Sequence, residues 1–133
     1  MAMPSEYVPG KCNIGHRGRA TRFSTGIIIL GISGVFGFLF LRDAAPSIVR
    51  LILVLPFYGG LISILEGTMS FCVFHAARGT YDIHEETWRT GRSKTRVEIV
   101  SDEWRRADRR KARFMHAEAI LGAIVLTAAV FFA

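Results

Sequence analysis

The chain has 133 residues, which is enough for a single domain. Hydrophobic residues make up 50% of it and its mean hydropathy is +0.31, which is too apolar for a small soluble core. The formal charge of +6 and the pI near 10.0 would suit a nucleic-acid-binding protein, but the basic residues flank apolar runs, as membrane topology requires. The composition therefore favours a membrane protein and gives no support for nucleic-acid binding.

The distribution of Lys and Arg predicts how the chain crosses the membrane. Fifteen of the seventeen basic residues precede the first of three apolar runs or separate the second from the third. Only Arg42 and Arg50 lie between the first two runs. Because basic loops stay on the cytoplasmic side, we predict an all-α membrane protein with three transmembrane helices, an antiparallel hairpin plus a third span. The amino terminus should be cytoplasmic and the carboxyl terminus periplasmic.

The first half of the chain is predicted to form an arm and a hairpin. Residues 1–23 should be a cytoplasmic N-terminal arm, and residues 24–77 a transmembrane helical hairpin. Its first helix is the apolar run Ser24–Leu41, and the turn Arg42–Ser47 is too short for anything but antiparallel helices. The second helix is expected over Leu51–Ala77. At about 1.5 Å per residue, a helix of this length exceeds the hydrocarbon core of roughly 30 Å, so it should be tilted or enter the interface.

The second half begins with a charged cytoplasmic segment over residues 78–113. Within it, Thr95–Val100 alternates as a short strand does, although a lone strand needs a partner. A helix should begin at about residue 101, with Ser101 as N-cap, and continue into the third transmembrane helix over residues 114–133. Two amphipathic side chains suit the headgroup layer: Trp88 and Trp104.

Small residues recur at helical spacing on the first two predicted spans, where they let a second backbone approach closely. The predicted helix-packing positions, with the carboxylate that shares their face, are Ser33, Gly37, Gly59, Ser63, Glu66, Gly67 and Ser70. A charge that faces lipid at the depth of Glu66 is costly, so this carboxylate should point at protein, be paired or be protonated. We predict an interhelical hydrogen bond to Ser63, Ser70 or a partner chain. A proton or cation site is the alternative.

A pattern of small and basic residues leads into the first span, and a related pattern closes the second. The motif positions are Asn13, Gly15, Arg19, Arg22, Gly26, Cys72 and Gly79. Together they resemble a family of small uncharacterised bacterial inner-membrane proteins, whose two-helix module is also found fused to rhodanese domains. The resemblance covers about residues 13–79. It implies an antiparallel helix pair that packs with itself or with partners, and the family has no general activity to carry over.

The chain departs from this family at three positions. Gly18 replaces an acidic residue, Val73 replaces a proline, and His75 stands where the family usually has an aromatic residue. Glu66 is not part of the family pattern. The resemblance therefore implies the hairpin fold and carries no chemistry at Cys72.

Three kinds of chemistry can be considered at the cytoplasmic end. Two short pairs could meet there as a Cys₂His₂ zinc set: Cys12, His16, Cys72 and His75. His75 and His116 should lie in the same leaflet, as bis-histidine haem ligation requires. A sulfur-relay role for Cys72, suggested by the rhodanese fusions, would need a lowered thiol pKa. Since Cys often serves as a small apolar residue, we predict no bound metal or cofactor, and no disulfide in a reducing cytoplasm.

The sequence contains no nucleophile triad, phosphate loop or paired catalytic carboxylates. We therefore predict a non-catalytic accessory or assembly subunit of a larger membrane protein complex, respiratory or photosynthetic, in the bacterial inner membrane. Its expected partners are the lipid bilayer and other membrane subunits, with a homo-oligomer as a second arrangement. The alternative is a redox membrane protein that handles sulfur or binds metal or haem through Cys12, Cys72 and nearby histidines.

Overall fold

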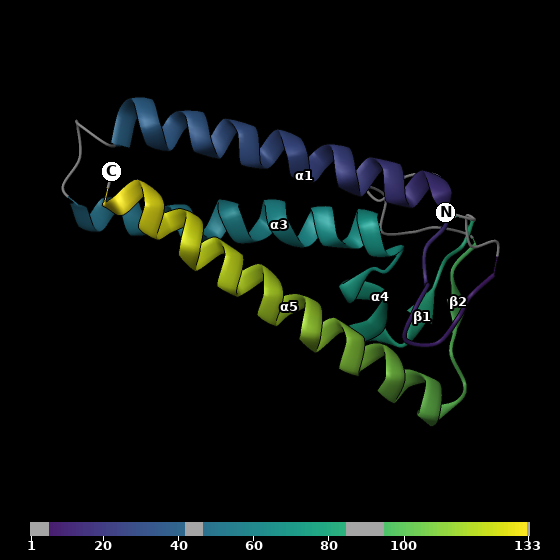
Figure 1. Ribbon diagram of the computed structural model, residues 1–133. Coiled ribbons are helices and arrows are strands. Elements are labelled where there is room, and N and C mark those ends of the chain that lie inside the picture. Colours follow the sequence, from purple (N-terminus) through teal and green to yellow (C-terminus); the bar gives the residue numbers. More distant parts are fainter. Residues whose placement is uncertain (1–5, 42–46, 85–94, 133) are drawn as a thin grey trace.

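The computed structural model describes residues 6–41, 47–84 and 95–132, and long helices dominate it (Figure 1). Three segments are long and apolar enough to cross a membrane: His16–Leu39, Arg50–Met69 and Asp102–Phe131. The prediction of a mostly helical chain with three helices that are long and apolar enough to span a membrane is therefore confirmed. Trp88, one of the two predicted headgroup anchors, lies outside the described residues.

Helix α1 spans His16–Phe36 and continues as a π-helical turn, η1, over Gly37–Leu41. The arm was predicted to reach residue 23, and its part from His16 on is helical. The basic stretch at the start of α1 is helical because Arg and Ala are good helix formers and no proline interrupts it. As a result Arg19 and Arg22 project from a helix and are not part of an extended arm.

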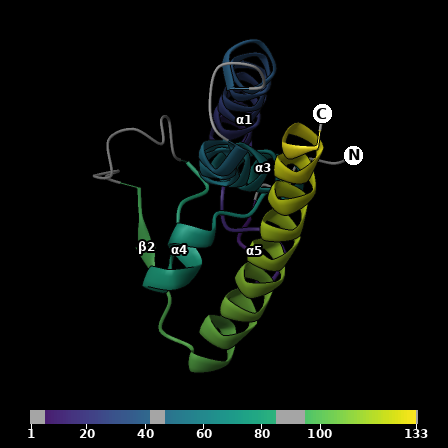
Figure 2. The same cartoon turned by 90° about the vertical axis from the view of Figure 1, so that its left-hand side faces the viewer.

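The second apolar run is not the single helix that was predicted over Leu51–Ala77. It begins as a 3₁₀ helix, η2, over Ser47–Leu53, continues as α3 over Val54–Met69, and resumes as a short helix, α4, over Val73–Arg78. The chain bends after Met69 because Ser70 adopts the left-handed conformation, with φ of 55°. Helix α4 therefore leaves the line of α3 and packs beside α5 (Figure 2).

Helix α5 spans Asp102–Phe131 and is continuous, as predicted. The Ser101 hydroxyl accepts a hydrogen bond from the Trp104 N–H at 3.4 Å, and Asp102 and Glu103 occupy the first turn, where acidic side chains favour the helix dipole. At 30 residues α5 is about 45 Å long, longer than a hydrocarbon core, so its charged beginning extends beyond the apolar span.

The three long helices form one layered bundle in which α3 lies between α1 and α5 (Figure 1). Two clusters of buried apolar side chains hold α3 and α4 against α5. One consists of Leu53, Phe57, Ala123 and Val130, and the other of Phe71, Ala76, Ala112 and Met115. The second cluster fills the space where α5 diverges from α3, under α4.

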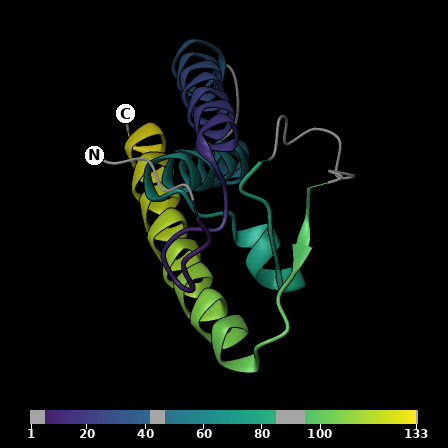
Figure 3. The ribbon, with the colours of Figure 1, turned by 90° about the vertical axis from the view of Figure 1, so that its right-hand side faces the viewer.

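The charged segment contains a two-stranded antiparallel sheet. Strand β1, Thr80–Tyr81, pairs with β2, Val97–Glu98, in the register Thr80 opposite Glu98 and Tyr81 opposite Val97. The strand predicted over Thr95–Val100 is therefore present in shortened form and finds its partner within the chain. The sheet and the amino-terminal arm lie together at one end of the bundle (Figure 3).

Glycines let α1 and α3 approach closely. Only some of the glycines predicted to pack lie at this interface. A Cβ at Gly26 would lie 2.6 Å from the Gly60 carbonyl oxygen, and one at Gly67 would lie 2.6 Å from the Phe23 Cβ. Gly59, which was predicted to pack, has nothing within 4 Å of its Cβ position. The correction follows from helix geometry: successive residues are rotated by about 100°, so Gly60 faces α1 and Gly59 does not.

Candidate functional site

The break between α3 and α4 leaves backbone polar groups that must find partners, because a buried unpaired peptide group costs free energy. The Phe71 N–H donates to the Glu66 carbonyl at 3.2 Å, and the Ser70 carbonyl accepts from the Asn13 N–H at 3.1 Å. The other backbone groups at the break bind the side chains of Asn13, Arg19 and Glu66. We call the set Asn13, Arg19, Arg22, Glu66 and Cys72 the polar junction.

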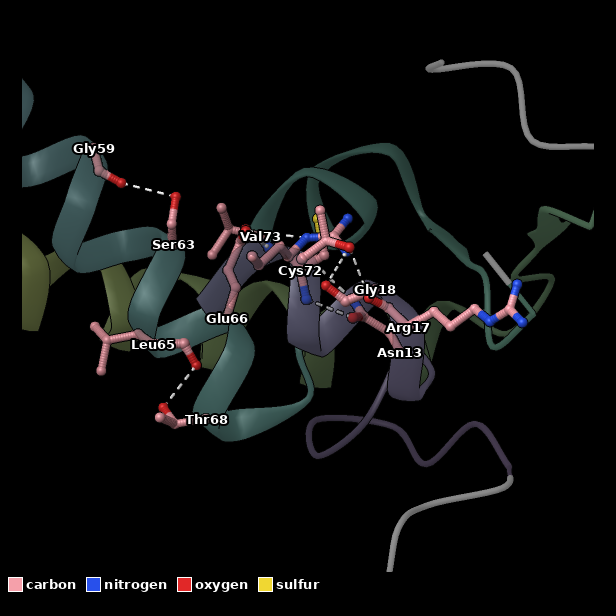
Figure 4. Close-up of polar contacts among 12 residues, drawn as sticks. Asn13, Arg17, Gly18, Gly59, Ser63, Leu65, Glu66, Thr68, Cys72 and Val73 are labelled. Atoms are coloured by element: carbon pink, nitrogen blue, oxygen red, sulfur yellow. Dashed lines mark hydrogen bonds and ion pairs between the residues drawn. The ribbon is translucent and has the colours of Figure 1, made fainter. Parts of the chain in front are cut away.

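Asn13 binds the break as a peptide group would. Its Oδ1 accepts from the Cys72 N–H at 2.6 Å, and its Nδ2 donates to the Cys72 carbonyl at 3.0 Å (Figure 4). Its own carbonyl accepts from the Asp82 N–H at 2.9 Å. Asn13 is fully buried. Through these hydrogen bonds it joins the arm to the start of α4 and to the segment after β1.

Arg22 and Glu66 form a buried ion pair between α1 and α3. Arg22 Nε lies 3.3 Å from Glu66 Oε2, and the two residues are 7% and 8% exposed. Glu66 Oε1 also accepts from the Val73 N–H at 2.9 Å, at the first residue of α4 (Figure 4). The carboxylate therefore points at protein and is paired, which is one of the states expected for it. It links α1, α3 and α4.

The two serines predicted as possible partners of Glu66 bond elsewhere. Ser63 donates to the Gly59 carbonyl of its own helix at 2.9 Å, and Ser70 contributes its backbone to Asn13. Sequence reasoning missed Arg22 because it placed this residue in the arm. The signal that could have found it was the antiparallel hairpin itself, which brings the start of the first helix beside the end of the second.

The remaining motif residues surround the polar junction. Arg19 Nε donates to the Gly67 carbonyl at 2.9 Å, next to the point where α3 ends. Gly15 lies so close to the Ile83 carbonyl that a Cβ would approach its oxygen to 1.8 Å. Gly79 ends α4 with φ of 70°, a conformation that favours glycine. The positions that carry the family resemblance are thus brought together in space.

The candidate metal ligands do not form a group in the described part of the chain, and each candidate haem ligand bonds a neighbouring hydroxyl. Cys12 and Cys72 are buried, whereas His16 is exposed at the start of α1. His75 is within 2.9 Å of the Thr80 hydroxyl, and the His116 ring bonds and stacks on Tyr58. Across residues 6–41, 47–84 and 95–132, no three His, Cys, Asp or Glu side chains are grouped as metal ligands.

No known protein family, no curated protein and no solved structure matches this chain. Its function must therefore be argued from the junction, the surfaces and the chemistry of its own residues.

The Cys72 thiol is poorly suited to sulfur chemistry. Burial, together with the charge of Glu66, raises its pKa from 9.0 to about 11, and the nearby Arg22 only partly opposes this. Burial likewise raises the pKa of the Cys12 thiol. Since the thiolate is the nucleophile, both cysteines are expected to be unreactive at neutral pH.

This can be measured by alkylation of a Cys12→Ser variant, in which Cys72 is the remaining thiol. A pKa of about 11 in place of 9.0 lowers the thiolate fraction at neutral pH about a hundredfold, so labelling by iodoacetamide should be slower than in the SDS-unfolded chain by at least that factor. The rate should rise as the pH approaches 11. Rapid labelling of the folded protein near pH 7 would contradict the burial of this thiol.

A second polar contact, also missed from sequence, fixes the arm to α5. Asp108 is fully buried, and its two carboxylate oxygens accept from the Tyr7 hydroxyl at 2.8 Å and from the Gly10 N–H at 2.7 Å. Tyr7 also stacks on Tyr81, with ring centroids 4.3 Å apart. Burial and the bond to Asp108 raise the Tyr7 pKa. The signal in the sequence was a single acidic residue among the many basic residues of this helical stretch.

Proposed function

We propose that the chain is a non-catalytic accessory or assembly subunit of a larger membrane complex, respiratory or photosynthetic, in the bacterial inner membrane, with its basic end in the cytoplasm. The observation that carries this proposal is the outward face of α1. Gly31 and Gly34 lie three residues apart on that face, and no atom of the described residues is within 4 Å of a Cβ at either position. These glycines thin the helix where its own chain does not use the space.

The outward face of α1 is also apolar over the second half of the helix. Ile28, Ile32 and Val35 are 59%, 66% and 58% exposed. In a lipid environment such side chains gain little from association alone, so close backbone approach at Gly31 is what would favour a partner helix over lipid. The inward face of α1, with Gly26, is already occupied by α3.

The buried polar groups support the same proposal. Arg22, Glu66 and Asn13 are bonded to one another's helices or to the backbone at the break, and Asp108 is bonded to the arm. Each therefore has a cohesive role. A carboxylate that carried protons or cations would instead need a path to solvent and an exchangeable partner.

The test begins with gentle detergent extraction of the tagged protein, followed by native gel separation, mass spectrometry and an absorption spectrum of the same band. We expect migration in a large complex with pigment- or haem-bearing subunits. Migration alone or as a small homo-oligomer would contradict the proposal.

A matched pair of variants connects this experiment to α1. Gly31→Leu places a bulky side chain on the outward face and is expected to reduce recovery of the complex several-fold while the helical circular dichroism is unchanged. Ala129→Leu is the control, because it makes a similar addition at an exposed position of α5. Full recovery of the complex with Gly31→Leu would show that this face is not the interface.

A further inference from the structure

Four arginines form a stripe on the charged part of α5. The stripe begins at Arg106, and the other three arginines lie three, four and seven residues after it: Arg109, Arg110 and Arg113. All four side chains are exposed. Residues so spaced lie on one face of a helix, within an arc of about 100°. The buried residues Asp108, Ala112 and Met115 occupy another side, against the arm and α4. We call these four arginines the arginine stripe.

The arginine stripe has no bonded counter-charge within the part of the chain that the structure describes. None of its four side chains has a hydrogen bond or ion pair there, in contrast to the neighbouring Arg105, which binds the Ile99 carbonyl at 2.6 Å and Glu98 at 3.3 Å. Asp108 is the only acidic residue between Arg105 and Arg113, and it is buried against the arm. Asp102 and Glu103 are exposed one turn before Arg106 on the same side of α5, without a bond to the stripe. Four guanidinium groups against two carboxylates leave this helix face with an excess of positive charge.

The stripe continues directly into the face of α5 that is open to lipid. Further along the helix, the same side carries Ile120, Leu121 and Ile124, which are 48%, 64% and 53% exposed. Phe114 follows Arg113 and is 62% exposed, so the stripe ends where the apolar span begins. Helix α5 is unbroken (Figure 1), so the helical spacing of these residues places the arginines on the same side as Ile120, Leu121 and Ile124.

The depth of the stripe also agrees with that of lipid headgroups. From Arg106 to Arg113 the helix rises about 10 Å, and any tilt of α5 shortens this rise along the membrane normal. The headgroup region on each side of the hydrocarbon core is about 5 to 8 Å thick. All four guanidinium groups, which extend further on flexible stems, can therefore reach phosphate level.

We propose that the arginine stripe is a binding site for anionic phospholipid headgroups. Guanidinium groups bind phosphate oxygens bidentately, and several on one face can hold more than one phosphate. An acidic protein surface would carry negative charge, as lipid phosphates do. Such a protein would have to approach α5 from the side that faces lipid. The site would hold α5 at a fixed depth and tilt in an anionic leaflet.

The experiment uses the full chain reconstituted in phosphatidylcholine vesicles that contain trace spin-labelled phosphatidylglycerol or spin-labelled phosphatidylcholine. Electron paramagnetic resonance measures the motionally restricted fraction of each label, and their ratio gives the preference for the anionic lipid. We expect the wild type to prefer phosphatidylglycerol several-fold, and the preference to decrease with salt. Arg109→Gln combined with Arg110→Gln should remove most of this preference, as expected for loss of two of the four basic contacts at the surface.

The control removes two exposed basic charges from the arm and the start of α1, with Lys11→Gln and Arg17→Gln, and should keep most of the preference. A second variant, Arg109→Lys with Arg110→Lys, keeps the charge and should lose less than the Gln pair. Unchanged helical circular dichroism and thermal unfolding would show that each variant is folded.

Equal motional restriction of the two spin-labelled lipids by the wild type would overturn the proposal. The proposal would also fail if the Arg109 and Arg110 variant and the Lys11 and Arg17 control lost the lipid preference to the same extent. A Gln pair that keeps its lipid preference but loses a co-purifying subunit would also overturn it. That result would assign the stripe to an acidic protein surface.

Discussion

Glu66→Gln and Arg22→Met are each expected to destabilise the folded protein by about 3 to 5 kcal/mol. Each substitution leaves the other member of a buried pair, with its atoms 3.3 Å from the lost partner, charged and uncompensated. Replacing both residues removes both charges, and the amide oxygen introduced by Glu66→Gln would still accept from the Val73 N–H. The double variant should therefore recover most of the loss. The free energy of unfolding can be measured by SDS titration in mixed micelles, followed by circular dichroism.

The control for this pair is Arg17→Met, on the same helix but exposed, which should change the unfolding free energy by about 0.5 kcal/mol or less. The double-mutant cycle separates the pair from the individual side chains. Additive losses at Arg22 and Glu66 would mean that the two residues are not coupled in the folded state, and would reopen Glu66 as an exchangeable proton site.

The spans and the start of α5 were accessible from the sequence because they depend on local information. Runs of apolar residues indicate a span whatever its neighbours are, and Ser101 with two acidic residues marks a helix start without reference to the rest of the fold. The break at Ser70 was not accessible. Its residues are as apolar as those around it, and Ser gives no sign of a left-handed conformation.

Prediction of the polar junction would have required the alignment of α1 against α3. Arg22, Glu66 and Asn13 were each selected for a separate reason, as motif residues or as a charge within an apolar run. Their meeting depends on the register of α1 against α3, which periodicity alone does not provide. Asp108 and Tyr7 show the same limitation, since 101 residues of sequence separate them.

The packing face of α3 was misassigned by extending a spacing of four residues. Each step of four rotates the helix by about 40° beyond a full turn, so Gly59 lies about 80° from Gly67 around the axis. Gly60, seven residues from Gly67, lies only about 20° from it. This difference in angle decides that Gly60, and not Gly59, contacts α1. The contact can be tested by substitution of Gly26, its partner on α1.

Gly26→Ala is expected to destabilise the α1–α3 interface by about 1 to 3 kcal/mol, and Gly26→Val by more. The new Cβ would lie 2.6 Å from the Gly60 carbonyl oxygen and 2.8 Å from the Ile64 backbone nitrogen, so the helices must separate. Separation would also lengthen the Arg22–Glu66 contact one helical turn away. The same micelle titration measures the effect.

Gly31→Ala is the matched control, because it makes the same chemical change on the same helix where nothing lies within 4 Å. It should be neutral or slightly stabilising, since Ala has the higher helix propensity, by up to about 1 kcal/mol. Equal losses at Gly26 and Gly31 would mean that glycine is needed along α1 for helix flexibility, and would contradict the close α1–α3 contact. A loss confined to Gly26 would support the inward packing face and leave the outward face available for a partner helix.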